Sequence, residues 1–255
     1  MGNELDGAVA LITGASSGIG EATARALASR GAKVALAARR IDRLRELENE
    51  IKSGGGDAVA IEADVTDASQ AESIVRSACG TYGRLDILIN NAGVMLLGPI
   101  VDAPVDEWHR MIDLNLTALM RVTHAALPHL LDAAKIEGRG VADVVNISSV
   151  AGRIARMGSG VYNATKFAVN AFSESLRQEV TTRHVRVGLI EPGFVATELQ
   201  SHLRPEIREA SRSRFAAITQ PLEAPDIAEA IAFMVTRPRH MAINEMLMRP
   251  TEQEG

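Results

Sequence analysis

Short runs of apolar residues alternate along the chain with longer segments in which apolar residues recur every three or four positions. Most of the short runs are apolar almost throughout, a pattern typical of strands that helices cover on both faces. These runs predict strands at 8–13, 33–38, 58–63, 85–90, 142–148, 185–191 and 242–248.

The longer segments predict amphipathic helices. In the segment 18–30, for example, Ile19, Ala22, Ala26 and Leu27 fall at helical spacing. The predicted helices are 18–30, 41–53, 67–82, 104–134, 158–183, 205–217 and 224–236. Alternating strands and helices form parallel sheets with right-handed crossovers. We therefore predict one α/β domain over residues 1–255, a doubly wound, Rossmann-type sheet of seven parallel strands with helices on both faces.

The segment 192–218 follows the sixth predicted strand and contains no strand of its own. In doubly wound folds, ligands bind beyond the carboxyl ends of the strands. A long connection at that edge of the sheet is typical of a lid. We expect this segment to cover the substrate.

Composition narrows the class of protein. Hydrophobic residues make up 46% of the chain and charged residues 23%, which fits a folded globular protein and not a disordered one. The net charge is −5 with no basic stripe, which argues against a nucleic-acid partner. The start of the chain is polar and acidic, and no apolar stretch approaches the ~20 residues of a membrane span. We expect a cytoplasmic protein that binds no membrane.

Metal and disulfide chemistry find little support in the sequence. The single cysteine, Cys79, cannot form an intramolecular disulfide, and the six histidines show no metal-ligand spacing. Only His202 falls in the predicted lid. We therefore expect a reducing compartment and no metal site.

A glycine-rich turn, TGASSGIG at residues 13–20, follows the first predicted strand and opens the first predicted helix. Such a turn lets backbone N–H groups approach a pyrophosphate, and the helix N-terminus adds partial positive charge. Gly14 would permit the tight turn, Gly18 the close approach, and Gly20 the packing of helix on strand. The turn predicts a dinucleotide-binding site.

The G-x-x-x-G-x-G spacing of this turn resembles the cofactor loop of the short-chain dehydrogenase/reductase family. Further motifs match that family in order along essentially the whole chain. They are Asp64-Val65, Asn90-Asn91-Ala92-Gly93, Asn115, Ser149, Tyr162-x-x-x-Lys166, Pro192-Gly193 and Thr197. Ser149 precedes Tyr162 by thirteen positions (162 − 149), which is the usual spacing in the family.

The resemblance implies a catalytic set of Asn115, Ser149, Tyr162 and Lys166. Hydride delivery to a carbonyl carbon builds negative charge on the oxygen, which an acid must protonate. Tyr162 would be that acid, and the Lys166 ammonium one turn away would lower its pKa from about 10. Lys166 would also hold the nicotinamide ribose, Ser149 would orient the substrate oxygen, and Asn115 would hold a water that links Lys166 to solvent.

The cofactor is predicted to be NADP(H). The second predicted strand ends in Ala37-Ala38 and continues into Arg39-Arg40, with no acid before Asp42. An acidic residue at this point would favour NAD, whereas a guanidinium suits a 2′-phosphate. Arg39 is the first candidate and Arg40 the second. The full set of expected cofactor-binding residues is Gly14, Ser16, Ser17, Gly18, Ile19, Gly20, Arg39, Arg40, Asp64, Val65, Asn91, Ala92, Gly93, Tyr162, Lys166, Pro192, Gly193 and Thr197.

The run NEMLMRPT at residues 244–251 resembles the ending of one branch of the family. That branch contains NADP-dependent serine 3-dehydrogenases, 3-hydroxy acid dehydrogenases and clavulanate dehydrogenase, and it implies a homotetramer. The first functional hypothesis is reduction of a ketone or aldehyde from NADPH. The second is oxidation of a small 3-hydroxy acid or hydroxy amino acid, with Arg153 or Arg156 holding the carboxylate. The third is a non-catalytic protein that senses NADPH, against which the complete catalytic set argues.

Overall fold

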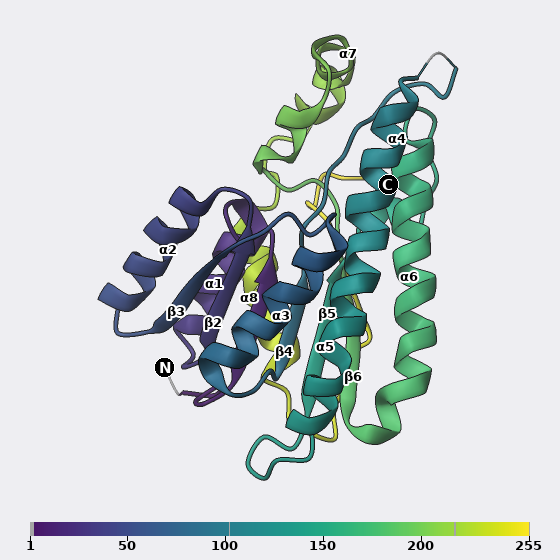
Figure 1. Ribbon diagram of the computed structural model, residues 1–255. Helices are drawn as coiled ribbons and strands as arrows, with labels where there is room; N and C mark the ends of the chain where they lie inside the picture. The colour runs from purple at the N-terminus through teal and green to yellow at the C-terminus, as the bar shows by residue number, and fades with distance from the viewer. Residues whose placement is uncertain (1–2, 102, 217, 255) are drawn as a thin grey trace.

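The computed structural model describes residues 3–101, 103–216 and 218–254 and contains one parallel sheet of seven strands (Figure 1). The strand order is β3-β2-β1-β4-β5-β6-β7, so the direction of winding reverses between β1 and β4. The strands are β1 (Val9–Thr13), β2 (Lys33–Ala38), β3 (Asp57–Glu62), β4 (Ile87–Asn90), β5 (Ala142–Ile147), β6 (Val185–Pro192) and β7 (Glu245–Met248). The predicted doubly wound, single-domain fold is confirmed.

Two layers of helices cover the sheet, and the pleat of the strands explains their apolar runs. In β1, Ala10 and Ile12 pack into the core on one face, while Val9 and Leu11 pack into the core on the other. Because successive side chains of a strand point to opposite faces, both sets must be apolar when both faces are covered. The helices are α1 (Gly18–Ala28), α2 (Ile41–Ser53), α3 (Ala68–Tyr82), α4 (Val105–Ile112), α5 (Leu119–Ala133), α6 (Gly160–Val180), α7 (Pro205–Ala216) and α8 (Ala224–Val235). Helices α1, α2 and α8 cover one face, and α3, α5 and α6 the other.

The predicted helix 104–134 is not one α-helix. Between α4 and α5 the backbone runs through a π-helical segment, η1 (Asp113–Ala118), which contains Asn115. A π-helix closes i→i+5 hydrogen bonds and is common at functional sites. Short 3₁₀ turns also follow β5, α6 and β6, namely η2 (Val150–Gly152), η3 (Thr181–Arg183) and η4 (Glu198–His202).

The last strand is shorter than the predicted 242–248, because the chain before it is held as a loop by Arg186. The Arg186 guanidinium donates to the backbone oxygens of Arg237 at 2.9 Å and Met241 at 2.8 Å. The same buried guanidinium pairs with both oxygens of Asp143, at 2.7 and 2.9 Å. A buried ion pair that also satisfies backbone carbonyls fixes this loop at the amino ends of β5 and β6.

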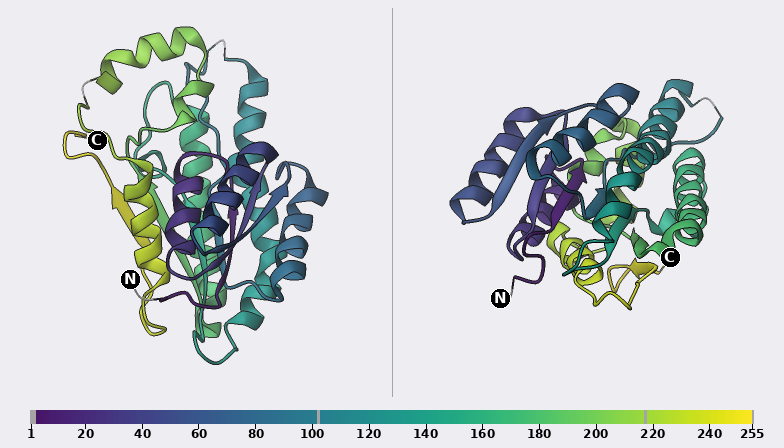
Figure 2. Two further views of the ribbon diagram at one scale, coloured as in Figure 1. Left: turned by 90° about the vertical axis from the view of Figure 1, so that its left-hand side faces the viewer. Right: turned by 60° about the horizontal axis from the view of Figure 1, so that its bottom comes forward.

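The connection from β6 to α8 stands over the carboxyl ends of the strands, where the left view of Figure 2 shows α7 arching across the top of the sheet. Its base is closed by a bridge between Val195 and Leu222. The chain end adds a second clasp, since the Gln253 side chain accepts from the Phe194 N–H at 2.8 Å and Glu252 accepts from the Thr219 hydroxyl at 2.7 Å. This arrangement suits the predicted lid, although its closure stays a prediction. No helix within the described ranges is long and apolar enough to span a bilayer.

We expect Arg186→Met to lower the free energy of unfolding by about 3 kcal/mol, because it leaves backbone carbonyls of the loop before β7 unpartnered and weakens a buried ion pair. Urea denaturation followed by circular dichroism measures this change. Arg177→Met is the matched control, since Arg177 pairs with Glu174 at the surface. Equal denaturation midpoints for the two variants would contradict the structural role of Arg186.

Candidate active site

A cavity of about 1220 Å³ opens at the carboxyl ends of the strands, where the strand order reverses between β1 and β4. Such a switch point is where doubly wound folds bind nucleotides. The cavity is lined by all the predicted catalytic and cofactor-binding residues except Gly20 and Asn115. The strands have therefore brought together residues from most of the length of the chain.

The glycine-rich turn lies in contact with the loop that follows β4. Gly14 and Gly18 have φ values of +67° and +57°, a region that favours glycine. A Cβ atom on Gly14 would lie 2.9 Å from the Ala92 Cα, and one on Gly20 would lie 2.5 Å from the Gly14 oxygen. Gly20 therefore permits close packing of α1 on the turn, as its sequence position suggested, and does not face the cavity.

Asn91 ties the two loops together. Its side-chain amide donates to the backbone oxygens of Thr13 at 2.9 Å and Gly14 at 3.2 Å. The Thr13 hydroxyl in turn accepts from the N–H groups of Asn91 and Ala92, at 3.0 and 3.1 Å. These bonds fix the turn that would receive the cofactor phosphates.

The two arginines after β2 differ in placement. Arg40 donates to the Ser16 hydroxyl at 3.1 Å and to the Ser17 hydroxyl at 2.6 Å, so it lies against the glycine-rich turn. The side chain of Arg39 is 74% exposed, and its nearest acidic partner is Asp64 at 3.8 Å. The sequence ranking placed Arg39 first, whereas the geometry gives Arg40 the closer approach to the turn.

Asp64 lines the cavity near Arg39. Burial acts to raise its pKa, but hydrogen bonds from the hydroxyl and N–H of Thr66, together with the Arg39 charge, hold that pKa below its usual value. Asp64 therefore carries a negative charge at neutral pH and acts as an acceptor there.

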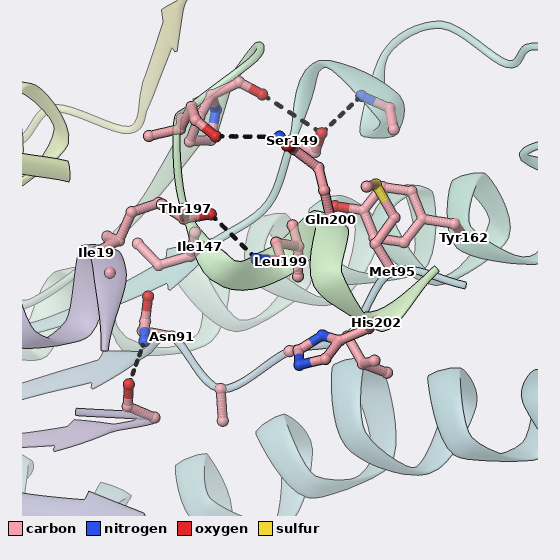
Figure 3. A pocket seen from close by; sticks show the side chains of 18 of the residues that line it. Ile19, Asn91, Met95, Ile147, Ser149, Tyr162, Thr197, Leu199, Gln200 and His202 are labelled. Carbon is pink, nitrogen blue, oxygen red and sulfur yellow. Dashed lines mark hydrogen bonds between the residues drawn. The ribbon is translucent and has the colours of Figure 1, made fainter. Parts of the chain in front are cut away.

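The catalytic candidates meet at the carboxyl end of β5. Ser149 begins the η2 turn, where its hydroxyl accepts from the Ala151 N–H at 3.1 Å and approaches the Pro192 oxygen at 3.4 Å. Tyr162 and Lys166 lie one turn apart on α6, and both are buried. The Lys166 ammonium donates to the Ile147 oxygen at 2.8 Å and lies 5.8 Å from the centre of the Tyr162 ring. Figure 3 shows Ser149 and Tyr162 at the same part of the cavity.

The acid–base properties of this pair differ from the sequence expectation. Burial raises the pKa of Tyr162 to about 12, although a hydrogen bond with Ser149 acts to lower it. Burial also lowers the pKa of Lys166 to about 8. The predicted lowering of the tyrosine pKa by the ammonium is therefore absent from this state of the protein, because desolvation of the phenol is the larger effect. Tyr162 is held protonated, which is the form a proton donor requires.

Asn115 lies behind the cavity. Its side-chain oxygen accepts from the Val94 N–H at 2.8 Å, and its amide donates to the Val94 oxygen at 2.9 Å and the Thr165 hydroxyl at 3.3 Å. The side chain thus connects η1 to the loop after β4 and to the residue before Lys166. Its role in holding a water stays a prediction.

Several residues around Tyr162 could not be found from a sequence pattern. Met95 packs against the cluster that contains the Tyr162 ring, and Gln200 reaches into the cavity from η4 (Figure 3). Residues of the chain end, including Glu252 and Gln253, also line the cavity. They come from loops whose path depends on tertiary contacts, so no periodic pattern marks them.

Three side chains singled out from the sequence differ in their placement. His202 lines the cavity, and burial together with the Arg110 charge lowers its pKa. Arg156 also lines the cavity, but Arg153 does not. Arg153 pairs instead with Glu191 and Glu245, so the hypothesis that it holds a substrate carboxylate is not supported.

Within the described residues, no group of three or more histidine, cysteine or acidic side chains is placed to hold a metal ion.

Comparisons with known proteins agree with this geometry. The family model for short chain dehydrogenases matches residues 8–208. An uncharacterized oxidoreductase of Staphylococcus saprophyticus is 35% identical over 254 residues, which cover 98% of this chain and 99% of the relative. Glycine betaine reductase of Emericella nidulans is 38% identical over 249 residues, which cover 98% of this chain but only 19% of that protein.

Among solved structures, the closed form of serine dehydrogenase complexed with NADP+ is similar over nearly its whole length. It shares 34% sequence identity with a TM-score of 0.87, and the match covers 97% of this chain and 96% of that one. Both the sequence and the fold thus agree over nearly the whole chain. The chain therefore belongs to the short-chain dehydrogenase family and is an oxidoreductase of that family.

Proposed function

We propose that this protein reduces a ketone or aldehyde to an alcohol with NADPH, with Tyr162 as the general acid. The observation that carries the proposal is that Ser149, Tyr162 and Lys166 line the same cavity as the glycine-rich turn. The turn suits a dinucleotide, since Gly14 and Gly18 place no side chain between the cavity and the backbone of the turn next to the N-terminus of α1. The NADP+ complex of serine dehydrogenase supports the choice of cofactor.

The residues of the chain divide the chemistry among them. A bound nicotinamide would supply the hydride to the carbonyl carbon. The Tyr162 hydroxyl would donate its proton to the carbonyl oxygen, and Ser149 would donate a hydrogen bond to the same oxygen and so orient it. Lys166 would hold the cofactor ribose and stabilise the phenolate that remains after the proton transfer. Asn115 would order a water through which Lys166 exchanges protons with solvent.

The 2′-phosphate of NADP(H) would lie against the arginines that follow β2. Arg40 already contacts Ser16 and Ser17 of the turn, and Arg39 lies at the rim of the same cavity. The remaining predicted contacts except Gly20 also line the cavity, and Asp64-Val65 would contact the adenine and Thr197 the carboxamide.

A second candidate is the reverse reaction on a small 3-hydroxy acid or hydroxy amino acid. The observation that favours it is the presence of Arg156 in the cavity lining between Ser149 and Tyr162 in the sequence. A guanidinium there would pair with a substrate carboxylate. Activity with carboxylated substrates, lost in Arg156→Ala, would select this candidate over reduction of neutral carbonyls.

We further propose that the enzyme works as a cytoplasmic homotetramer. Met111, Leu119 and Leu176 of α4, α5 and α6 are buried within the subunit. Ile112 and Phe167, however, are 40% and 43% exposed, and they lie on α4 and α6. Exposed large apolar residues on neighbouring helices are typical of a subunit interface.

Tyr162→Phe should abolish turnover and leave cofactor binding intact, because it removes the donated proton and keeps the ring. General acid catalysis contributes about 10²- to 10⁴-fold, so we expect kcat to fall at least about a hundredfold. Steady-state kinetics with NADPH and a carbonyl panel measure the loss, and nucleotide fluorescence measures binding. A kcat within about fivefold of the wild type would refute the assignment of the acid.

Lys166→Ala should both slow the reaction and weaken NADPH binding, since the lysine is proposed to contact tyrosine and ribose. The pH profile tests the charge directly. Because burial lowers the pKa of Lys166 to about 8, the wild type should lose reductive activity as the ammonium deprotonates above that pH. This alkaline loss should be missing in Lys166→Ala. An identical profile and an identical cofactor affinity in the two proteins would reject both roles.

The wild type should prefer NADPH to NADH by at least about tenfold in kcat/KM, because a charge-assisted hydrogen bond contributes roughly 1.5–3 kcal/mol. Changing Ala38→Asp together with Arg39→Ala should erase or invert this preference. Arg40→Ala alone should reduce it more than Arg39→Ala alone, given the contacts of Arg40 with the turn. Arg43→Ala, one turn further along α2, is the control and should change it little. A wild type that uses NADH better would overturn the reading of these arginines.

Sedimentation velocity at micromolar concentration should give a mass near four times that of the 27.2 kDa chain. Phe167→Glu should shift the protein toward smaller species, because it places a charge on the proposed interface. Wild-type protein that sediments as a monomer would disprove the tetramer.

A further inference from the structure

A group of polar side chains lies directly behind the catalytic residues and takes no part in the chemistry proposed above. We call it the Glu191 cluster, and it consists of the side chains of Ser148, Arg153, Asn170 and Glu191 together with the backbone oxygen of Gly152. Its members come from the end of β5, the η2 turn, α6 and the end of β6. Of the five, only Ser148 lines the cavity.

Glu191 is the centre of this cluster, and its side chain is 0% exposed. Its two carboxylate oxygens accept from the Arg153 guanidinium, each at 2.7 Å, in a bidentate pair. One of them also accepts from the Asn170 amide at 2.7 Å. A buried carboxylate destabilises a protein unless it is paired and hydrogen-bonded. Moving Glu191 away from Arg153 or Asn170 would therefore cost free energy.

Asn170 connects Glu191 to the η2 turn through hydrogen bonds. Besides Glu191, its amide group donates to the Gly152 oxygen at 3.2 Å, and its oxygen accepts from the Ser148 hydroxyl at 2.5 Å. Space at this point is fully used, because a Cβ atom on Gly152 would lie 2.8 Å from the Ser148 hydroxyl and 3.0 Å from the Lys166 oxygen. The turn cannot shift without breaking these contacts.

Three members of the cluster are within one residue or one helical turn of the proposed machinery. Ser148 precedes Ser149, Asn170 is one helical turn beyond Lys166, and Glu191 precedes Pro192, whose oxygen lies near the Ser149 hydroxyl. Arg153 ends the η2 turn that Ser149 begins, and it also reaches Glu245 of β7. The cluster therefore connects three backbone segments that adjoin the reacting groups, namely the η2 turn, α6 and the end of β6.

We propose that the Glu191 cluster positions Ser149 and Lys166 for the reaction, with Arg153, Asn170 and Glu191 as positioning residues that touch neither substrate nor cofactor. This inference rests on the proposed function, since it assigns these residues to the same reaction. Misplacement by about 1 Å from a change outside the reacting groups can lower a rate as much as about a hundredfold. Loss of the cluster should accordingly slow turnover and leave cofactor binding intact.

The test uses Glu191→Gln, which keeps the shape of the side chain but removes its charge, and Asn170→Ala, which removes the bridge and leaves the ion pair. Glu174→Gln is the matched control, because Glu174 pairs with Arg177 on the exposed face of α6, the helix that also carries Asn170. For each protein, kcat for a carbonyl substrate, the NADPH dissociation constant, the binding stoichiometry and the thermal midpoint are measured.

We expect kcat to fall at least about tenfold in Glu191→Gln and in Asn170→Ala. The NADPH dissociation constant should stay within about twofold at one cofactor per chain, and Glu174→Gln should match the wild type. Should Glu191→Gln fail to fold, Asn170→Ala decides the matter. Variants that bind NADPH normally and turn over within about twofold of the wild type would overturn the positioning role, as would parallel losses of cofactor binding and turnover. If instead the wild type and Glu174→Gln reduce no carbonyl, the proposed function fails and not the cluster alone.

Discussion

The site depends on one close approach, that of the glycine-rich turn after β1 to the loop after β4. Gly14 lies so near Ala92 that a Cβ atom would be 2.9 Å from the Ala92 Cα, and the Asn91 amide bonds the turn directly. These strands are neighbours at the point where the winding reverses. The cavity opens there because the connecting helices leave to opposite faces of the sheet, and both loops line it.

The other half of the site depends on the burial of polar groups. Tyr162 and Lys166 lie in a layer from which water is largely removed, so burial keeps the phenol protonated and lowers the pKa of the ammonium. Both shifts favour neutral side chains. Charge at the lysine is therefore easily lost, which gives the proposed reaction its dependence on pH. In the Glu191 cluster behind them, by contrast, the side chains of Arg153 and Glu191 are charged, and their ion pair holds the backbone in place.

The periodicity of the sequence was sufficient to predict the sheet, because fully covered strands must be apolar on both faces. It placed β2 and α2 at their observed bounds, and the motifs at the strand ends converged on the cavity. It could not predict the π-helical segment at Asn115, since the hydrophobic spacing of a π turn hardly differs from that of an α-helix over six residues. It also could not predict that Arg40 contacts the glycine-rich turn or that Arg153 pairs with Glu191. Side-chain direction determines both contacts, and it depends on partners such as Ser17 and Glu191 that lie far away in the sequence.

The central claim is that hydride passes within this cavity to a carbonyl carbon next to Tyr162. It is tested most directly by incubating the protein with NADPH that carries deuterium at one of the two C4 positions, together with a carbonyl substrate, and by locating the label in the alcohol. We expect one deuterium at the carbinol carbon, from one of the two C4 positions only, and none when Tyr162→Phe replaces the wild type. Alcohol formed without deuterium from either C4 position would contradict it.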